Sequence, residues 1–183
     1  MSLENTKLKG KPGQFTDQGF TATQFASATD KATFANKMTR FILGGFQVSS
    51  FNKKMYQHLS NMFGHIAHYD IHGFYQTWFS DAKACCRWVE NMTNNWLVGI
   101  GDPKYTWSDV EKALVEWIKD NQIAVQLDEI NTAEERAGEL ALLQHLQEKY
   151  AAEEVPAMDT PLEIVVEINP APAKVEAAQM SLF

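Results

Sequence analysis

The chain has 183 residues, of which 45% are hydrophobic and 11% aromatic, so it can build the core of one domain and is not disordered throughout. Its formal net charge of -7 is unevenly placed, because residues 1–54 carry eight Lys/Arg and three Asp/Glu whereas residues 128–183 carry three and twelve. This asymmetry suggests different partners for the two ends, or a solvated acidic tail on a near-neutral domain.

Several kinds of protein are excluded by what the chain lacks. No run approaches the ~20 apolar residues that a membrane helix needs, and residues 1–5 lack the regions of a signal peptide. The only cysteines, Cys85 and Cys86, are adjacent, so they form neither a disulfide framework nor a CxxC site. We therefore expect a reduced, cytoplasmic protein with no membrane partner.

Residues 1–28 are predicted to form an extended arm. Three lysines are followed by phenylalanines at every fifth residue, a period that fits neither helix nor strand. Lysines followed by spaced aromatics can track a phosphate backbone and stack on unpaired bases, whereas the alternative is an arm that wraps the body with phenylalanine anchors. The residues concerned are Lys7, Lys9, Lys11, Phe15, Phe20 and Phe25.

Residues 29–150 are predicted to form an all-α domain, a compact bundle of five or six helices. The first helix spans 31–43, is capped by Thr29 or Asp30 and ends at a glycine pair. The second follows a cap at Ser49 or Ser50, and we expect it to break near residues 69–73.

Further helices are predicted after that break. Aromatic residues at 74–79 form a short helical segment, and the next helix begins at Ser80-Asp81 and buries both cysteines and Trp88.

Two capping boxes, in which a Ser or Thr and a Glu satisfy each other's backbone amides, predict the last helices. Ser108 with Glu111 opens one helix, and Thr132 with Glu135 opens another that runs to about Tyr150. The outer face of this last helix is rich in glutamate, and it can pair with another helix. Because 19 of the 21 aromatic residues precede residue 118, we expect the core upstream of about residue 120.

Residues 151–178 are predicted to be a flexible acidic linker. Proline, alanine and glutamate dominate this stretch, which cannot bury enough apolar surface to fold alone. Within it, residues 162–168 alternate between apolar and acidic side chains, which is a strand pattern. This short strand adds to a sheet edge in this protein or a partner, or remains part of the linker.

The pentapeptide Gln179–Phe183 is the most specific signal in the chain. It has a polar residue, a small polar residue and then Leu-Phe at the chain's end, where large apolar side chains need a partner to bury them. These residues are Gln179, Met180, Ser181, Leu182 and Phe183.

The pentapeptide resembles the Gln-x-[Ser/Asp]-Leu-Phe motif by which bacterial replication and repair proteins dock on the ring-shaped DNA sliding clamp. The resemblance covers these five residues only. It implies that Leu182 and Phe183 fill a hydrophobic pocket, that Gln179 hydrogen-bonds at a neighbouring subsite, and that Ser181 holds the bend. Met180 stands where leucine is commoner, and its flexible thioether suits a tolerant position.

A histidine stripe offers a different chemistry. His65, His68 and His72 would share one face of a continuous helix, a spacing at which imidazoles can ligate one metal ion. A metal-activated water there would make a nucleic-acid-processing enzyme. The alternative is that the three histidines line the boundary of an amphipathic helix, and in that case no cofactor is expected.

The leading expectation is a non-enzymatic accessory protein that docks on the bacterial sliding clamp. It would recruit its body to replication or repair sites, where it can contact DNA, or exclude host polymerases from the clamp. A small chain with a host-directed motif fits a phage or plasmid gene. The alternatives are the metal-dependent enzyme and a helical module that binds single-stranded nucleic acid through the arm.

Overall fold

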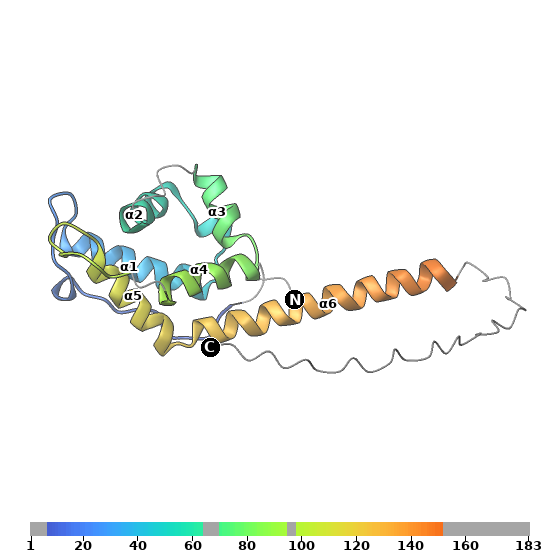
Figure 1. Cartoon of the computed structure of the whole chain (residues 1–183). Helices are drawn as coiled ribbons and strands as arrows, with labels where there is room; N and C mark the ends of the chain where they lie inside the picture. The colour runs from blue at the N-terminus through green and yellow to red at the C-terminus, as the bar shows by residue number, and fades with distance from the viewer. Residues whose placement is uncertain (1–6, 64–69, 95–97, 152–183) are drawn as a thin grey trace, which may run out of the picture. The chain divides into compact units, whose positions relative to one another are not determined.

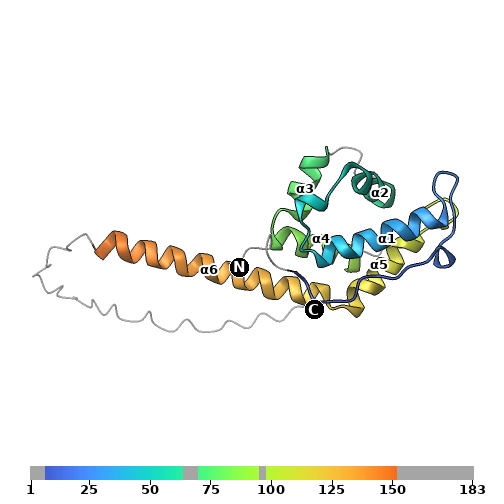
Figure 2. The ribbon, with the colours of Figure 1, turned by 180° about the vertical axis from the view of Figure 1, so that it is seen from behind.

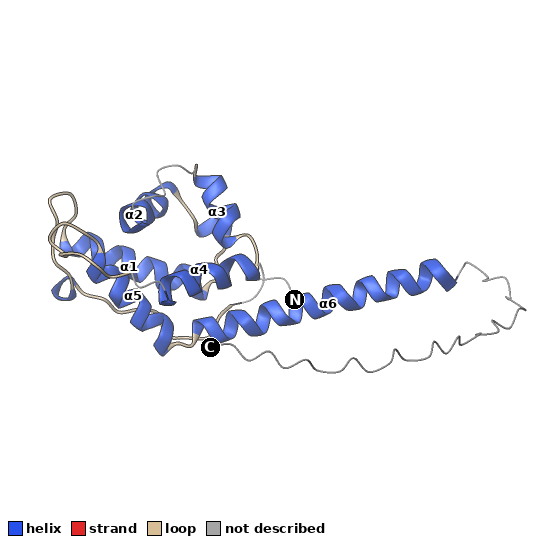
Figure 3. Cartoon of the chain, in the orientation of Figure 1, coloured by secondary structure: helices blue, strands red, loops and turns tan. Residues whose placement is uncertain are grey.

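Six α-helices make up the part of the chain that this computed structural model describes, residues 7–63, 70–94 and 98–151 (Figure 1). Helices and loops account for all of these residues, with no strand among them (Figure 3). The expected all-α class is therefore confirmed. The predicted strand at 162–168 lies outside the described residues.

The first helix, α1 (Ala28–Leu43), begins one turn earlier than its capping pattern indicated. Ser27, rather than Thr29 or Asp30, is the cap: its hydroxyl accepts the Asp30 amide at 3.1 Å, and the Asp30 carboxylate accepts the Ser27 amide at 3.2 Å. The predicted apolar face is buried, and it comprises Phe34, Met38, Phe41 and Ile42.

The short helix η3 (Val48–Ser50) leads from α1 to α2 (Lys53–Phe63), so the expected serine caps are wrong. The Asn52 side chain instead accepts the amides of Lys54 and Met55, each at 3.1 Å. Asparagine and serine are about equally favourable as helix caps, so residue type alone could not show that Asn52, rather than Ser49 or Ser50, caps α2.

The expected break before residue 74 is confirmed. Asp70 has an extended backbone, and its side chain accepts the Gly73 amide and caps α3 (Ile71–Phe79). The next helix, α4 (Ala82–Asn94), begins where Asp81 accepts the Ala84 amide at 2.8 Å. It buries Cys85 and Trp88 as predicted, whereas Cys86 is only partly buried.

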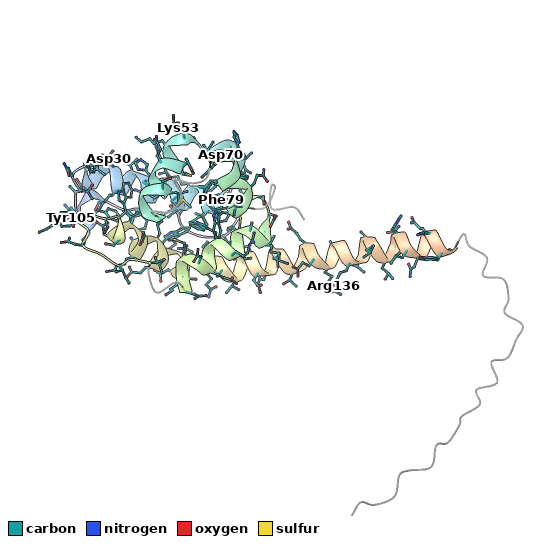
Figure 4. The ribbon with its side chains drawn as sticks, turned by 45° about the horizontal axis from the view of Figure 1, so that its top comes forward. Asp30, Lys53, Asp70, Phe79, Tyr105 and Arg136 are labelled. Carbon is teal, nitrogen blue, oxygen red and sulfur yellow. The ribbon has the colours of Figure 1, made fainter. Side chains whose placement is uncertain are left out.

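Phe79 lies at the centre of the packed helices (Figure 4). Its ring centroid is 5.2 Å from that of Phe41 in α1 and 5.4 Å from that of Trp88 in α4. Further aromatic contacts come from Phe46, Phe51, Phe74 and Tyr75. In both Figure 1 and Figure 2, α2 and α3 lie on the same side of α1 and α4, which brings these rings together.

The two residues Gly45 and Phe46, which follow α1, have a left-handed backbone conformation. Gly45 has φ 76° and the fully buried Phe46 has φ 56°. A phenylalanine rarely adopts this conformation, and surrounding contacts must hold it there. The Phe46 amide donates to the Phe41 carbonyl at 3.0 Å, and the Tyr75 hydroxyl donates to the Phe46 carbonyl at 2.8 Å.

Both predicted capping boxes are wrong. Helix α5 (Ser108–Asp120) begins after Trp107, while Ser108 donates to the Gly101 carbonyl and Glu111 accepts the Gly99 amide. Helix α6 (Ile123–Ala151) is continuous, so Thr132 lies inside it. Ile123 and Leu127 are buried, which extends the core slightly beyond the expected limit at residue 120.

The chain divides into two units at Gln144 and His145, within α6. The first unit holds the whole described core, in which α1 packs against α2 and α5 and α4 packs against α3 and α5. In the second unit, the described residues 145–151 are the last turns of α6, and all of them are exposed.

A buried ion pair joins the segments around α1 and α5. The Lys31 side chain is 0% exposed, and its ammonium lies 2.9 Å from the Asp109 carboxylate, which is 14% exposed. The ammonium also donates to the carbonyls of Pro103 and Thr106, at 3.0 and 2.9 Å. Asp109 in turn accepts the Thr21 amide at 2.8 Å, so one ion pair ties the arm to both helices.

We expect Lys31→Met to lower the free energy of unfolding by about 3–5 kcal/mol, because it leaves a nearly buried carboxylate and two carbonyls without their donor. Urea unfolding followed by circular dichroism measures the change. Lys37→Met is the matched control, since Lys37 is exposed on the same helix and its replacement should cost less than about 0.5 kcal/mol. Equal losses in the two variants would contradict the structural role of the ion pair.

Candidate functional site

The arm is bound to the helical body mainly through its backbone. Leu8 is buried, and its amide donates to the Leu43 carbonyl at 3.0 Å. The Gln126 side chain accepts the Lys9 amide at 2.7 Å and donates to the Lys9 carbonyl at 2.8 Å. The Lys11 amide donates to the Asn121 side chain at 2.9 Å. These contacts fix the path of the arm and leave the lysines themselves, Lys7 included, exposed.

The three phenylalanines of the arm do not form one stacking platform. Phe15 and Phe20 pack against the core, with 6.0 Å between their ring centroids, as the anchoring interpretation expects. The Asn36 side chain holds both backbone groups of Phe15, accepting its amide at 2.9 Å and donating to its carbonyl at 2.8 Å. Phe25, in contrast, is 91% exposed and anchors nothing.

An open groove of about 1040 Å³ is lined by the arm and by the corner between α5 and α6. Lys9 and Lys11 line it on one side, and Asp120 and Glu129 line it on the other. Two ammonium groups are thus matched by two carboxylates, so the groove lacks the positive potential that binding to a phosphate backbone requires.

Phe15→Ala should lower the free energy of unfolding by about 2–4 kcal/mol, because a partly buried anchoring ring is lost. Phe25→Ala removes the same ring from an exposed position and should change stability by less than about 0.5 kcal/mol. Thermal and urea unfolding of the two variants side by side measure the difference. If the Phe25 variant were the less stable one, the described path of the arm would be incorrect.

The histidine stripe is only partly described. His65 and His68 lie outside the described residues, and His72 is exposed in the first turn of α3. Because Asp70 is extended and begins a new helix, His72 does not continue the helix that carries His58, and the premise of one continuous helix is wrong. Within the described ranges, no three His, Cys, Asp or Glu side chains are grouped to hold a metal ion.

Neither cysteine is suited to nucleophilic chemistry. Cys85 is fully buried in α4, and burial raises the pKa of its thiol well above the ordinary value. Burial also raises the pKa of the partly exposed Cys86 to about 11, with a smaller contribution from Asp128. Both therefore remain thiols at neutral pH, which agrees with the structural role expected for the pair.

His58 occupies a site that the sequence did not single out. Its ring packs against those of Phe34 and Trp107, with centroid distances of 5.3 and 5.0 Å, and these two rings also contact each other at 5.5 Å. Its Nδ1 is buried and has no hydrogen-bond partner among the described residues. A cavity of about 30 Å³ beside it has room for one water molecule. The lining residues are Asp30, Thr33, Phe34, Lys37, Asn52, Lys54, Met55 and His58.

The surroundings of His58 disfavour its charged form. Burial lowers the pKa of the imidazole most, Lys54 and Lys37 lower it further, and Asp30 opposes them. The unfolded chain, with a pKa near 6.5, therefore binds this proton more readily than the folded protein does. Stability that is present above pH ~6.5 is lost as the pH falls below that value.

His58→Phe should flatten the fall in unfolding free energy between about pH 7 and pH 5, because the ring contacts remain and the proton-binding group is gone. Urea unfolding over this pH range measures the slope. Met55→Leu serves as the control, since Met55 lines the same cavity and its replacement removes no ionisable group, so the slope should stay unchanged. An unchanged slope in the His58 variant would contradict the assigned direction.

Two signals in the sequence could have revealed what was missed. Lys31 is spaced like an apolar residue, one turn before Phe34 and Ala35 on the buried face of α1, and a lysine at such a position needs a buried partner. No comparable signal identifies Asp109 as that partner. His58 borders the buried Met55 and Leu59 face, but nothing in the sequence indicates the two rings that contact it.

The pentapeptide Gln179–Phe183 lies outside the described residues, and its role stays a prediction. None of the described helices combines the length and the apolar character needed to cross a membrane. Comparisons of the chain with protein-family models, with curated proteins and with solved structures found no match.

Proposed function

We propose that this protein is an accessory factor that docks on the bacterial DNA sliding clamp through Gln179–Phe183. The observation that carries the proposal is the pentapeptide itself, in which a glutamine and a serine precede an adjacent leucine and phenylalanine. Leu182 and Phe183 enter the apolar pocket of the clamp, and Gln179 hydrogen-bonds beside it. Burial of the two apolar side chains contributes roughly 1.5–3 kcal/mol each before the cost of ordering the peptide.

The segment between the described body and the pentapeptide supports a tethered mode of docking. Residues 152–178 follow the end of α6 and can span at most about 90 Å if fully extended. The body can therefore stand well away from the ring while the pentapeptide is bound. The described core extends from Leu8 to Leu127, so docking does not draw on any residue of that core.

Charge supports a protein partner rather than DNA for this segment. Residues 152–183 carry six Asp/Glu and one lysine, so they are repelled by a phosphate backbone. An acidic tether beside DNA thus leaves the pentapeptide available to the clamp. The free peptide should bind at about micromolar strength, and repeated subunits of the ring raise its effective concentration.

Pull-down with purified clamp tests the proposal. The wild-type chain should be retained, and Leu182→Ala/Phe183→Ala should not, because two buried side chains together supply most of the binding energy. Val155→Ala/Val175→Ala is the matched control, since it removes two apolar side chains from the same segment outside the strand pattern at 162–168 and should leave retention unchanged. Equal retention of the wild type and the Leu182/Phe183 variant would end the proposal.

A second measurement separates recruitment from exclusion. A clamp-binding host polymerase is added in increasing amounts to clamp that is already bound by the wild-type chain. Mutual displacement means that this protein and the polymerase compete for one pocket on the clamp, whereas a ternary complex means that the protein is recruited beside the polymerase.

A further inference from the structure

The later part of α6 presents large apolar side chains that the described residues do not cover. Every residue from Glu135 to Ala151 is exposed. Leu140 is 59% exposed and Leu143 is 52% exposed. Together with Leu142, Leu146 and Tyr150, they make this stretch the richest in exposed large hydrophobic residues within the described chain.

These side chains lie on the face of α6 opposite to the one that joins the core. At about 100° per residue, Ile123, Leu127 and Ile130 fall within roughly 60° of one another; the first two are buried in the core, and Ile130 packs against it. Leu140, Leu143, Leu146 and Tyr150 form a second stripe, about 120° wide, whose centre is roughly 180° away. The face of α6 that joins the core is therefore not the face that carries this leucine stripe.

A helix with an exposed apolar face needs packing contacts with another segment or another protein to be stable. Isolated helices of about 15 residues are marginal in water, and most helical stability in proteins comes from the packing of an apolar face. An ion pair at 3.6 Å between the exposed side chains of Lys83 and Glu135 links the beginning of this stretch to α4. A surface pair of this type adds little stability.

We propose that the leucine stripe is the surface on which two copies of this chain pair, with their α6 helices antiparallel and a twofold axis at Leu143. In this register Leu143 meets its own copy, and Leu140 lies opposite Leu146 of the second copy. A twofold axis makes each contact occur twice, which doubles the apolar area that one short stripe can bury.

The charges on α6 select the antiparallel arrangement. In the register centred on Leu143, Arg136 lies opposite the Tyr150 ring of the second copy and Glu139 lies opposite Gln147, so no like charges face each other. A parallel pair in register would place Arg136 against Arg136 and Glu139 against Glu139, and like charges directly opposite are unfavourable.

A second copy fits the stripe better than the chain's own acidic segment does. Residues 131–151 carry four glutamates against one arginine and one lysine, a net charge of -2. Residues 152–183 have six acidic residues and one lysine, a net charge of -5, so they are repelled by this stretch more strongly than a second copy of it is. Because the seam is short, we expect a dimer that dissociates at micromolar concentration.

Sedimentation equilibrium of the full chain, from micromolar to submillimolar concentration, tests the pairing. The wild type should change from monomer to dimer over this range, and Leu143→Glu should raise the dissociation constant more than tenfold because two carboxylates meet at the axis. Ala141→Glu adds the same charge two residues away on the opposite face and should leave the dissociation constant within about twofold.

The orientation of the pair has its own test at Gln147. In the antiparallel register, Gln147→Lys places an ammonium opposite Glu139 twice and should tighten the dimer, whereas Gln147→Glu should weaken it. In a parallel pair, residue 147 would face its own copy, so both substitutions would weaken it.

Several results would overturn the proposal. A wild-type chain that stays monomeric over the whole range shows that its own segment or another protein covers the stripe. A dimer that Leu143→Glu does not weaken has its interface elsewhere. Weakening by both Gln147 substitutions excludes the antiparallel register. Circular dichroism of each variant at high concentration shows whether the helical body is intact, so loss of pairing is not confused with unfolding.

Discussion

The ammonium group of Lys31 is the contact on which the arrangement of this domain depends. It reaches the Asp109 carboxylate and the carbonyls of Pro103 and Thr106, and Asp109 also holds the Thr21 amide. Two stretches that are distant in sequence, residues 21–31 and 103–109, thus meet at one buried charge. Removal of any one of these partners would leave a buried charge or a buried carbonyl unsatisfied, and this cost constrains how the two stretches meet.

The aromatic cluster around Phe79 also constrains how the helices pack, through apolar contacts. Rings from α1, α3 and α4 and from the segment between α1 and α2 converge on Phe79, and their edge-to-face contacts favour particular orientations. This packing holds Phe46 in its left-handed conformation, since the buried ring and the bond from Tyr75 fix both its side chain and its carbonyl. The ion pair therefore fixes one end of the domain, and the aromatic cluster fixes its centre.

Individual residues show which features of the structure could be predicted from the sequence and which could not. Apolar spacing placed Phe34 and Met38 on the buried face of α1, because helical periodicity is a local property. The predicted capping boxes were wrong because contacts outside the local sequence decide them. The Glu111 carboxylate accepts the Gly99 amide, and Thr132 lies inside a helix that begins at Ile123, where Ile123 and Leu127 pack in the core. The partners of Lys31 and His58 come from distant segments, which no local pattern can reveal.

The docked arm has a consequence for how the chain acquires its structure. Lys9 binds Gln126 and Lys11 binds Asn121, across 117 and 110 residues of sequence, although the fold is helical and most of its contacts are local. Loops of this length close slowly relative to helix formation. During synthesis, the arm leaves the ribosome before α5 and α6 do, so it waits for nearly the last helix of the body before it can bind, and until then Leu8 stays in contact with water.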